Sequence, residues 1–379
     1  MRIILGLFLR RYGVPMRLTS LILLLSLILV SASPAFGQDA APQIKAEIAR
    51  LQKSLKDNPV TDPIFSGMAS ETGKILDAAN QSVAAGQLYL SLEKLELAEN
   101  LVVGMHTAAD KDDVVKNGLP AFEARWSKAS FSLTALDQRM RDKDWGHSLA
   151  VMQALYQEAQ GSAIPLLDGA RGFATSTNPP DGLFNLGQAM GEAEFVSFAA
   201  SLHLPQTKAA LPLRSILPEL NLLQEKTNAA FQPPKSIELQ SGFIALNSAL
   251  KVAEELDAKK SYAGALYQYL LAVGYYGMLN AKPLDAASQA ELKVTLAAVK
   301  KKLDESSTDE TVAQLFQQRA EAAILPGGSM PSADDWRAAK VILEEVLPAY
   351  FALRSPAVPA NALPTGKTVA LTLVRWPYT

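Results

Sequence analysis

The uncharged segment from Ser261 to Ala281 constrains the fold of this 379-residue chain more than any other stretch. Apolar and aromatic residues recur along it at steps of three and four, which is the spacing of a helix face. One face carries Tyr262, Leu266, Tyr269, Val273 and Tyr276, and the opposite face carries Tyr267, Leu271, Tyr275 and Met278. A helix that is apolar on both faces must be covered on both sides. The segment therefore predicts a buried helix with other helices packed around it.

The tyrosines of this segment allow more than one interpretation. We favour core packing, because a stripe at helical spacing usually belongs to the core. The alternative is an aromatic groove for a sugar or a peptide, since tyrosine combines an apolar ring with a hydrogen-bonding tip. At 21 residues the segment is long enough for a transmembrane helix, but its five tyrosines, three glycines and one glutamine make it a poor lipid-facing segment.

The first 37 residues have the pattern of a signal peptide. Arginines at positions 10, 11 and 17 precede an apolar run over 18–30, and small residues at Ala35 and Gly37 suit a signal peptidase. We predict cleavage after Gly37 and a periplasmic or secreted protein. The alternative is an inner-membrane anchor through residues 18–37, the one case in which we expect membrane contact. The remaining chain has 32 basic and 38 acidic residues, a net charge of −6, which argues against nucleic acid as a partner.

Helical periodicity with short connections continues through most of the chain beyond the signal region. The predicted helices cover residues 41–57, 63–84, 86–103, 120–141, 182–202, 236–256, 261–281, 288–303, 307–323 and 332–354. Ser307 with Glu310, and Ser332 with Asp335, have the spacing of capping boxes. The three glycines at 161, 169 and 172 are expected to interrupt the helix that follows Trp145. The pattern predicts an all-α protein built of antiparallel helical hairpins, stacked as an array or packed as a bundle.

The segment 175–181, TSTNPPD, is the clearest internal linker. It predicts an N-terminal helical lobe over 38–175 and a C-terminal helical lobe over 182–354. Residues 355–364 contain three prolines and no helical period, so residues 355–379 form a third region that begins with an extended linker.

Beyond this linker, residues 368–374 alternate between apolar and smaller side chains, which predicts one short C-terminal β-strand. A single strand leaves its backbone groups unpaired. We expect it to add to the sheet of a protein partner in the cell envelope. The expected partner-binding residues are Val369, Leu371, Leu373, Arg375, Trp376 and Tyr378. Alternatively, the strand pairs within its own chain, folds back on the helices or is disordered.

Small and aliphatic residues mark one helical pair in particular. Its first helix carries Ala249, Val252, Ala253 and Leu256, and its second carries Ala265, Tyr269 and Ala272. Over 249–272 the chain resembles tetratricopeptide-type repeats, although the signature tryptophan and the closing proline of that family are absent. The resemblance implies a stacked helical scaffold that binds other proteins and performs no chemistry.

Residue types that commonly carry catalysis or bind metals are sparse in this chain. There is no cysteine, and the three histidines are far apart. His106 lies near Asp110, Asp112 and Asp113 but lacks the paired spacing of metal ligands, so we interpret this region as a solvated acidic loop. We predict no metal, no cofactor and no enzymatic activity.

From these patterns we predict that the protein is an exported, non-catalytic scaffold or protein-binding module of the cell envelope. The alternative is a small-ligand-binding protein, for a sugar or a peptide, or an enzyme, with a pocket between the two lobes near Trp126, Trp145 and the tyrosines. A cavity on which two or more ionisable groups converge would favour this alternative.

Overall fold

The computed structural model describes residues 40–354 except 61, 142–147, 203, 205, 234–235 and 326–329, without the side chains of 64, 140 and 141. Within this part of the chain the fold is all-helical, which confirms the predicted class. Ala209 and Thr308 form an isolated parallel bridge there and belong to no strand. The predicted C-terminal strand at 368–374 lies outside the described residues.

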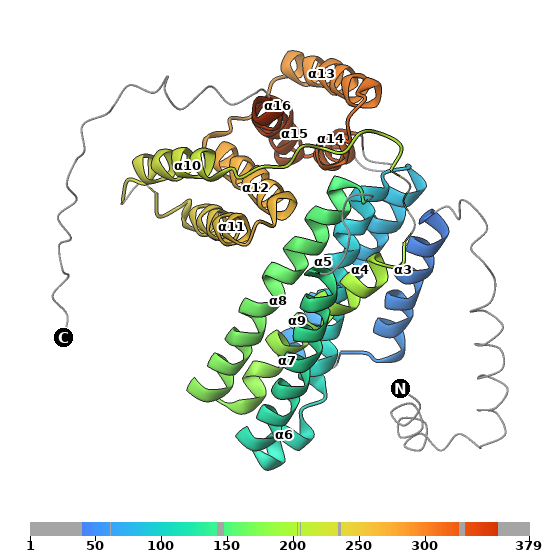
Figure 1. Cartoon of the computed structure of the whole chain (residues 1–379), viewed down its shortest axis with the longest axis vertical. Coiled ribbons are helices and arrows are strands. Elements are labelled where there is room, and N and C mark those ends of the chain that lie inside the picture. Colours follow the sequence, from blue (N-terminus) through green and yellow to red (C-terminus); the bar gives the residue numbers. More distant parts are fainter. Residues whose placement is uncertain are drawn as a thin grey trace.

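The helices form two groups (Figure 1). The first group consists of α3 (Ala40–Asp57), α4 (Pro63–Ala84), α5 (Leu88–Ala109), α6 (Asp112–Asn117), α7 (Leu119–Arg141), α8 (Ala150–Ser176), the 3-10 helix η1 (Pro179–Gly182) and α9 (Leu183–Ala199). The second consists of α10 (Leu217–Ala230), α11 (Gln240–Ala258), α12 (Tyr262–Asn280), α13 (Ala286–Glu305), α14 (Thr311–Ile324), α15 (Ala333–Val341), the π-helical turn η2 (Ile342–Val346) and α16 (Leu347–Arg354). The predicted boundary between the two lobes, at 175–182, lies inside the first group, where η1 joins α8 to α9. The division of the chain into two lobes stays a prediction.

Two predicted hairpins are present. Helices α4 and α5 pack together across a connection whose Gly86 has φ 76°, a left-handed conformation that suits glycine. Helices α11 and α12 pack together across a turn in which Lys260 has φ 61°. Both short connections fold their two helices back on each other, as the sequence predicts.

Helix α8 corrects one prediction. It continues unbroken from Ala150 to Ser176, through three glycines and Pro165. Two of the glycines serve packing there, because a Cβ at Gly161 would lie 3.1 Å from Leu256 of α11, and one at Gly169 would lie 3.4 Å from Asn185 of α9. Tertiary contacts on both sides outweigh the low helix propensity of glycine, which costs about 1 kcal/mol per residue.

The helix starts agree with the sequence in part. Ser332 and Asp335 form the predicted capping box at the start of α15. The box predicted at Ser307 and Glu310 is wrong, because Glu310 instead accepts hydrogen bonds from Ser306 and Tyr350, and α14 begins at Thr311. The acidic stretch near residue 112 is not a plain loop but the first turn of α6.

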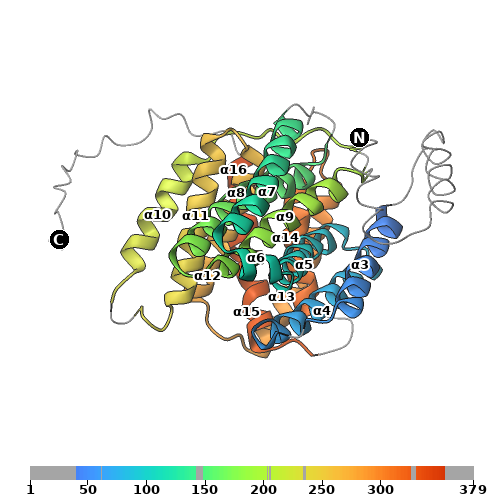
Figure 2. The ribbon, with the colours of Figure 1, turned by 90° about the horizontal axis from the view of Figure 1, so that it is seen from below.

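The predicted buried helix is α12, in which ten of the 19 residues are buried. Its neighbours include α11 on one side and α8 on the other. Seen from below, α5, α8 and α9 occupy the middle of the molecule, between α3 at one edge and α10 at the other (Figure 2).

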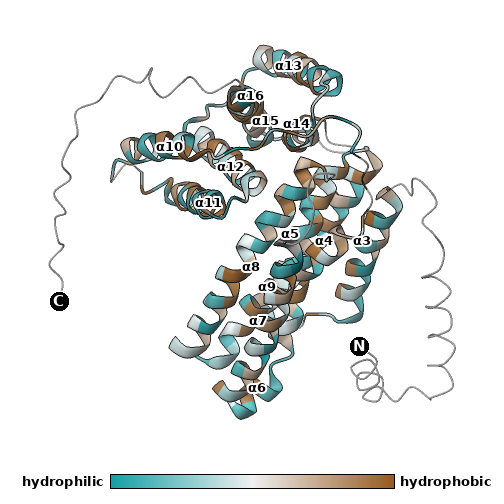
Figure 3. Ribbon diagram, in the orientation of Figure 1, coloured by the Kyte–Doolittle hydropathy of each residue, from teal (hydrophilic) through white to brown (hydrophobic). Residues whose placement is uncertain are grey.

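The largest hydrophobic cluster extends from α3 to α16 and so includes residues of both groups. A smaller cluster fills the far end of the first group, around Phe122 and Leu183. Hydrophilic residues interrupt every labelled helix (Figure 3), and among the described residues no helix has the length and apolar character needed to cross a membrane.

Candidate functional site

A groove of about 710 Å³ lies where the two groups of helices meet. Helices α5, α8 and α9 contribute to it from the first group, and α11, α12 and α14 contribute from the second. Ionisable side chains from four of these helices line it, namely Glu93, Lys94, Glu96, Glu158, Glu192 and Arg319. The groove therefore brings together charges that are far apart in the sequence.

One face of α12 forms the aromatic wall of the groove. Tyr267, Leu271 and Tyr275 line it at successive steps of four residues, which is one of the two faces visible in the sequence. Tyr267 is buried, whereas Tyr275 is 39% exposed. Core packing was thus an incomplete interpretation of these tyrosines, because this face of α12 also borders an open groove.

The groove has one well-formed ion pair. Arg319 of α14 donates from both Nε and Nη2 to the Glu93 carboxylate of α5, with an Nε–Oε2 distance of 2.7 Å. The Tyr267 hydroxyl donates to Glu93 Oε1 at 2.5 Å. These bonds join α5, α12 and α14 and fix the orientation of the aromatic wall. They also neutralise Glu93, so the remaining carboxyls determine the charge of the groove.

Glu96 of α5 and Glu158 of α8 form a carboxyl pair. Both side chains line the groove, and the charge of Glu158 disfavours ionisation of Glu96. Glu158 Oε1 also accepts from Ser162 at 2.9 Å and from Gln268 at 3.1 Å. Glu96 is only 7% exposed, and its Oε1 makes no hydrogen bond within the described residues.

Glu192 of α9 is the third buried carboxyl, with 4% exposure. Its Oε1 accepts from Asn100 Nδ2 at 2.5 Å, and its Oε2 makes no hydrogen bond within the described residues. A polar atom that is buried without a partner costs about 1–3 kcal/mol. Together with Glu96, this residue places buried carboxyl oxygens without a hydrogen-bond partner in the lining of the groove.

Burial changes the protonation of this cluster. Loss of hydration raises the pKa of Glu96 well above its ordinary value, and the charges of Glu158 and Glu192 raise it further. The pKa of Glu192 is raised for the same reason, with a contribution from the charge of Glu158. Burial also lowers the pKa of Lys94. The groove therefore contains acids whose protonated form is favoured by the fold.

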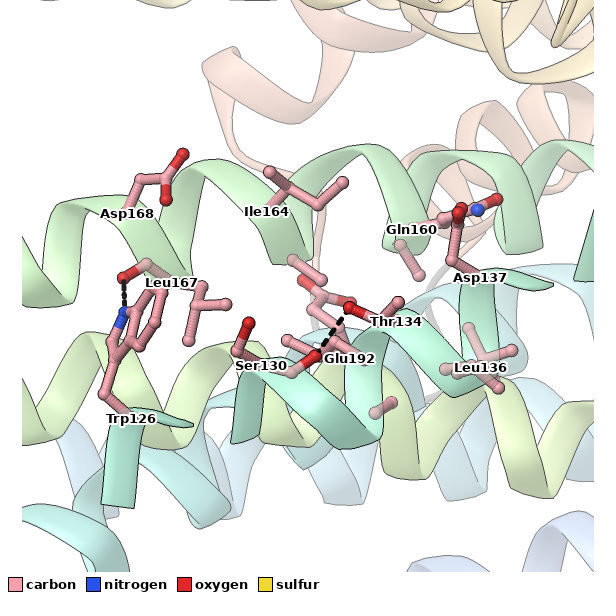
Figure 4. A pocket seen from close by; sticks show the side chains of 15 residues that line it. Trp126, Ser130, Thr134, Leu136, Asp137, Gln160, Ile164, Leu167, Asp168 and Glu192 are labelled. Atoms are coloured by element: carbon pink, nitrogen blue, oxygen red, sulfur yellow. Dashed lines mark hydrogen bonds between the residues drawn. The ribbon is translucent and has the colours of Figure 1, made fainter. Parts of the chain in front are cut away.

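A second cavity of about 340 Å³ lies between α7, α8 and α9 (Figure 4). Its lining is more apolar, and the Trp126 indole at one end donates from Nε1 to the Leu167 carbonyl at 2.9 Å. Glu192 lines this cavity as well as the groove, and Figure 4 shows it opposite Ile164. The buried carboxyl of α9 is thus shared by two cavities of different character.

The expected partner-binding residues of the tail, Val369, Leu371, Leu373, Arg375, Trp376 and Tyr378, all lie outside the described residues, as does Trp145. Trp126 lines the second cavity and not the groove. No cluster of three or more potential metal-binding side chains occurs in the described part of the chain. Near His106, the carboxylates of Asp110 and Asp113 pair with Arg125.

The sequence prediction missed Glu96, Glu158 and Glu192. A signal was present, because Glu96 and Glu192 each lie in a mainly apolar helix beside residues that belong to the core. Their convergence was not visible, since it depends on the packing of three helices.

No known protein family, no curated protein and no solved structure matches this chain. The all-helical architecture and the packed hairpins are compatible with a helical-repeat protein, but no match supports the tetratricopeptide-type family. We therefore infer a ligand site from the geometry of the groove.

Proposed function

We propose that this protein is an exported, non-catalytic binding protein that holds a small organic molecule in the groove between its two groups of helices. The observation that carries the proposal is the convergence of Glu96 and Glu192 on an open groove, each with a carboxyl oxygen that has no hydrogen bond within the described residues. Buried polar groups are nearly always satisfied in folded proteins, so two such carboxyl groups in one concavity favour a ligand site.

The groove shifts the balance between the two functions considered from the sequence. A stacked scaffold for protein partners needs a filled core and an extended surface, and it does not require ionisable groups that converge on a groove. A ligand site needs a concave surface with a few fixed polar groups and apolar walls. The Glu93–Arg319 ion pair, the carboxyl pair and the Tyr267 face meet the second requirement. The proposal of export rests on the sequence pattern of residues 1–37.

Filling the groove tests the proposal. Leu97 lines the groove and is 49% exposed, so Leu97→Trp adds bulk there without disturbing the core. Leu222 on α10 is 53% exposed and lines no described cavity, which makes Leu222→Trp a matched control. The melting temperature of each protein is measured with 1,4-diaminobutane, arginine, glucose or alanyl-alanine.

We expect at least one of these compounds to raise the melting temperature of the wild type and of Leu222→Trp but not of Leu97→Trp, because only a ligand of the folded state stabilises it. Stabilisation that survives in Leu97→Trp would place binding elsewhere. A complete lack of stabilisation in the wild type would also count against the proposal.

A second candidate function keeps the sequence-based expectation of a protein partner. It is favoured by the alternating residues 369–373 and the proline-rich segment before them. Capture of an envelope protein by the full chain, lost on deletion of 365–379, would support it. Equal capture by both forms would argue against strand addition.

A further inference from the structure

We propose that the ligand of the groove is a cationic aliphatic amine, whose ammonium group is received among Glu96, Glu158 and Glu192 in exchange for a proton. This inference rests on the proposed function, because it names the ligand class for the same groove. The geometry favours a cation because the groove-lining side-chain atoms with unused bonding capacity are oxygens of Glu96, Glu192 and Asn100. The amide oxygen accepts hydrogen bonds, and the carboxyl oxygens do so when ionised.

The charge balance of the groove supports a cation. The titratable and charged groups that face it are Glu93, Lys94 and Glu96 on α5, Glu158 on α8, Glu192 on α9, Tyr267 and Tyr275 on α12, and Arg319 on α14. With Glu96 and Glu192 protonated, the two remaining carboxylates balance the lysine and the arginine. Each of these two acids that loses its proton leaves one uncompensated negative charge, so one ammonium group balances one released proton and a diamine balances two.

Exchange for a proton follows from the carboxyl pair. Glu96 is buried without a basic partner in the described residues, and its burial and the nearby charge of Glu158 both favour a bound proton. An ammonium group brings the same charge and three hydrogen-bond donors, so it can replace that proton without leaving a buried charge unpaired. The released proton passes to the solvent.

The walls of the groove suit the carbon chain of such a ligand. Leu97, Val252 and Leu271 line it together with the rings of Tyr267 and Tyr275. A cation beside a tyrosine ring is attracted to the face of the ring, and more strongly when it is shielded from water. The groove thus offers both apolar contacts and acidic groups among its lining residues.

A set of matched four-carbon compounds tests the ligand class. Binding of 1,4-diaminobutane, 1,4-butanediol and succinate to the full mature chain is measured by titration calorimetry at pH 6, 7 and 8. We expect the diamine alone to bind. Its affinity should rise with pH, by up to about tenfold per unit for each proton released. At pH 7, measurements in phosphate and in Tris should give different heats, since the released proton is taken up by the buffer.

Glu96→Gln is the informative variant, because glutamine resembles the protonated carboxyl in shape and cannot ionise. We expect the diamine to bind Glu96→Gln at least about tenfold more weakly, with a smaller dependence on pH. Glu158→Gln, in a half-buried position, provides a second variant with the same expectation. Glu99→Gln is the control, since Glu99 is a buried glutamate of the same helix that pairs with Arg50 and does not line the groove.

The outcomes separate this inference from the proposed function. If glucose, alanyl-alanine, butanediol or succinate binds and Leu97→Trp prevents it, the groove is a ligand site but the amine assignment is wrong. If the diamine binds equally to the wild type, Glu96→Gln and Glu158→Gln, or releases no proton, the proposed exchange is wrong. If none of the compounds binds to the wild type, both proposals fail.

Discussion

At the scale of single residues, the buried glutamates are the most unusual feature of the protein. Glu96, Glu99 and Glu192 are each less than 9% exposed, although among the described residues only Glu99 of the three pairs with a basic side chain, that of Arg50. Glutamate is rarely buried without a cationic partner, because removing a carboxylate from water is costly. Retention of protons is the physical solution, and it links the stability of the fold to pH.

The free energy of unfolding is expected to fall as the pH rises from 6.5 to 8. An acid whose pKa is higher in the folded chain than in the unfolded chain binds its proton more tightly when the chain is folded. Its contribution to the free energy of unfolding is lost as the pH rises from the unfolded pKa through the folded pKa. Burial raises the pKa of Glu99 to about 8, and the pKa values of Glu96 and Glu192 are raised as well. Burial lowers the pKa of His106 from its ordinary value of 6.5, so this histidine changes the free energy of unfolding mainly below pH 6.5.

Urea unfolding at pH 6.5, 7.2 and 8 measures this dependence. Each carboxyl that stays protonated in the fold contributes a loss of about 1.4 kcal/mol per pH unit. Glu96→Gln should show a shallower decline than the wild type. A free energy of unfolding that rises over this interval would contradict the assignment of protons to the buried glutamates.

The ion pair of the groove is expected to stabilise the fold. Arg319→Met leaves the Glu93 carboxylate with Tyr267 alone, in a position where the carboxylate side chain is 15% exposed. We expect a loss of about 2–3 kcal/mol, because a partly buried charge then lacks its partner. Lys251→Met, which removes an exposed pair with Glu255, should cost about 0.5 kcal/mol or less. Similar losses in both variants would show that the Arg319 pair has no special role.

At the scale of helices, the crossing of α5 and α9 positions the acids. The two helices approach closely because glycines face the partner backbone: a Cβ at Gly191 would lie 2.7 Å from Asn100 Cα, and one at Gly187 would lie 2.6 Å from the Val103 carbonyl oxygen. Glu192 follows Gly191 directly, so the same contact brings its carboxyl to Asn100. Close packing of these helices and the formation of the groove are therefore coupled.

Gly191→Ala is expected to destabilise the protein by about 1–3 kcal/mol, since its methyl group would meet backbone atoms of α5 that cannot move independently. Gly172→Ala in α8 is the matched control, because a Cβ there meets nothing within 4 Å. That change should stabilise the helix by about 0.5–1 kcal/mol. Thermal unfolding of both variants measures the two changes in stability. Equal changes would show that close packing at the crossing of α5 and α9 does not require Gly191.

The helices themselves were predictable from the sequence to a much greater degree than the groove. The two faces of α12 and the hairpins α4–α5 and α11–α12 follow from local periodicity and short connections. The continuity of α8 did not follow, because the contacts of Gly161 and Gly169 come from helices distant in the sequence. For the same reason, the spacing of Tyr267 and Tyr275 identified a face of α12, while the glutamates opposite it were not recognised.

At the scale of the whole molecule, two groups of helices share one large core and enclose the groove between them. This arrangement places the site at the junction and not within either group. The N-terminal segment and the C-terminal tail lie outside the described residues, so their roles follow from the sequence alone.

Export is expected to yield a mature chain that begins at Gln38, because the small residues before it suit signal peptidase. N-terminal sequencing of the protein from the envelope fraction checks this. A chain that retains residues 18–37 and partitions with the inner membrane would instead support the anchored alternative.

A crystal structure of the mature protein grown with 1,4-diaminobutane at pH 8 tests the central claim most directly. We expect an ammonium nitrogen within hydrogen-bonding distance of Glu96 Oε1 or Glu192 Oε2, with the carbon chain along the Tyr267–Tyr275 face. A groove that contains no diamine, together with unchanged carboxyl contacts, would contradict the claim that these buried glutamates form a binding site.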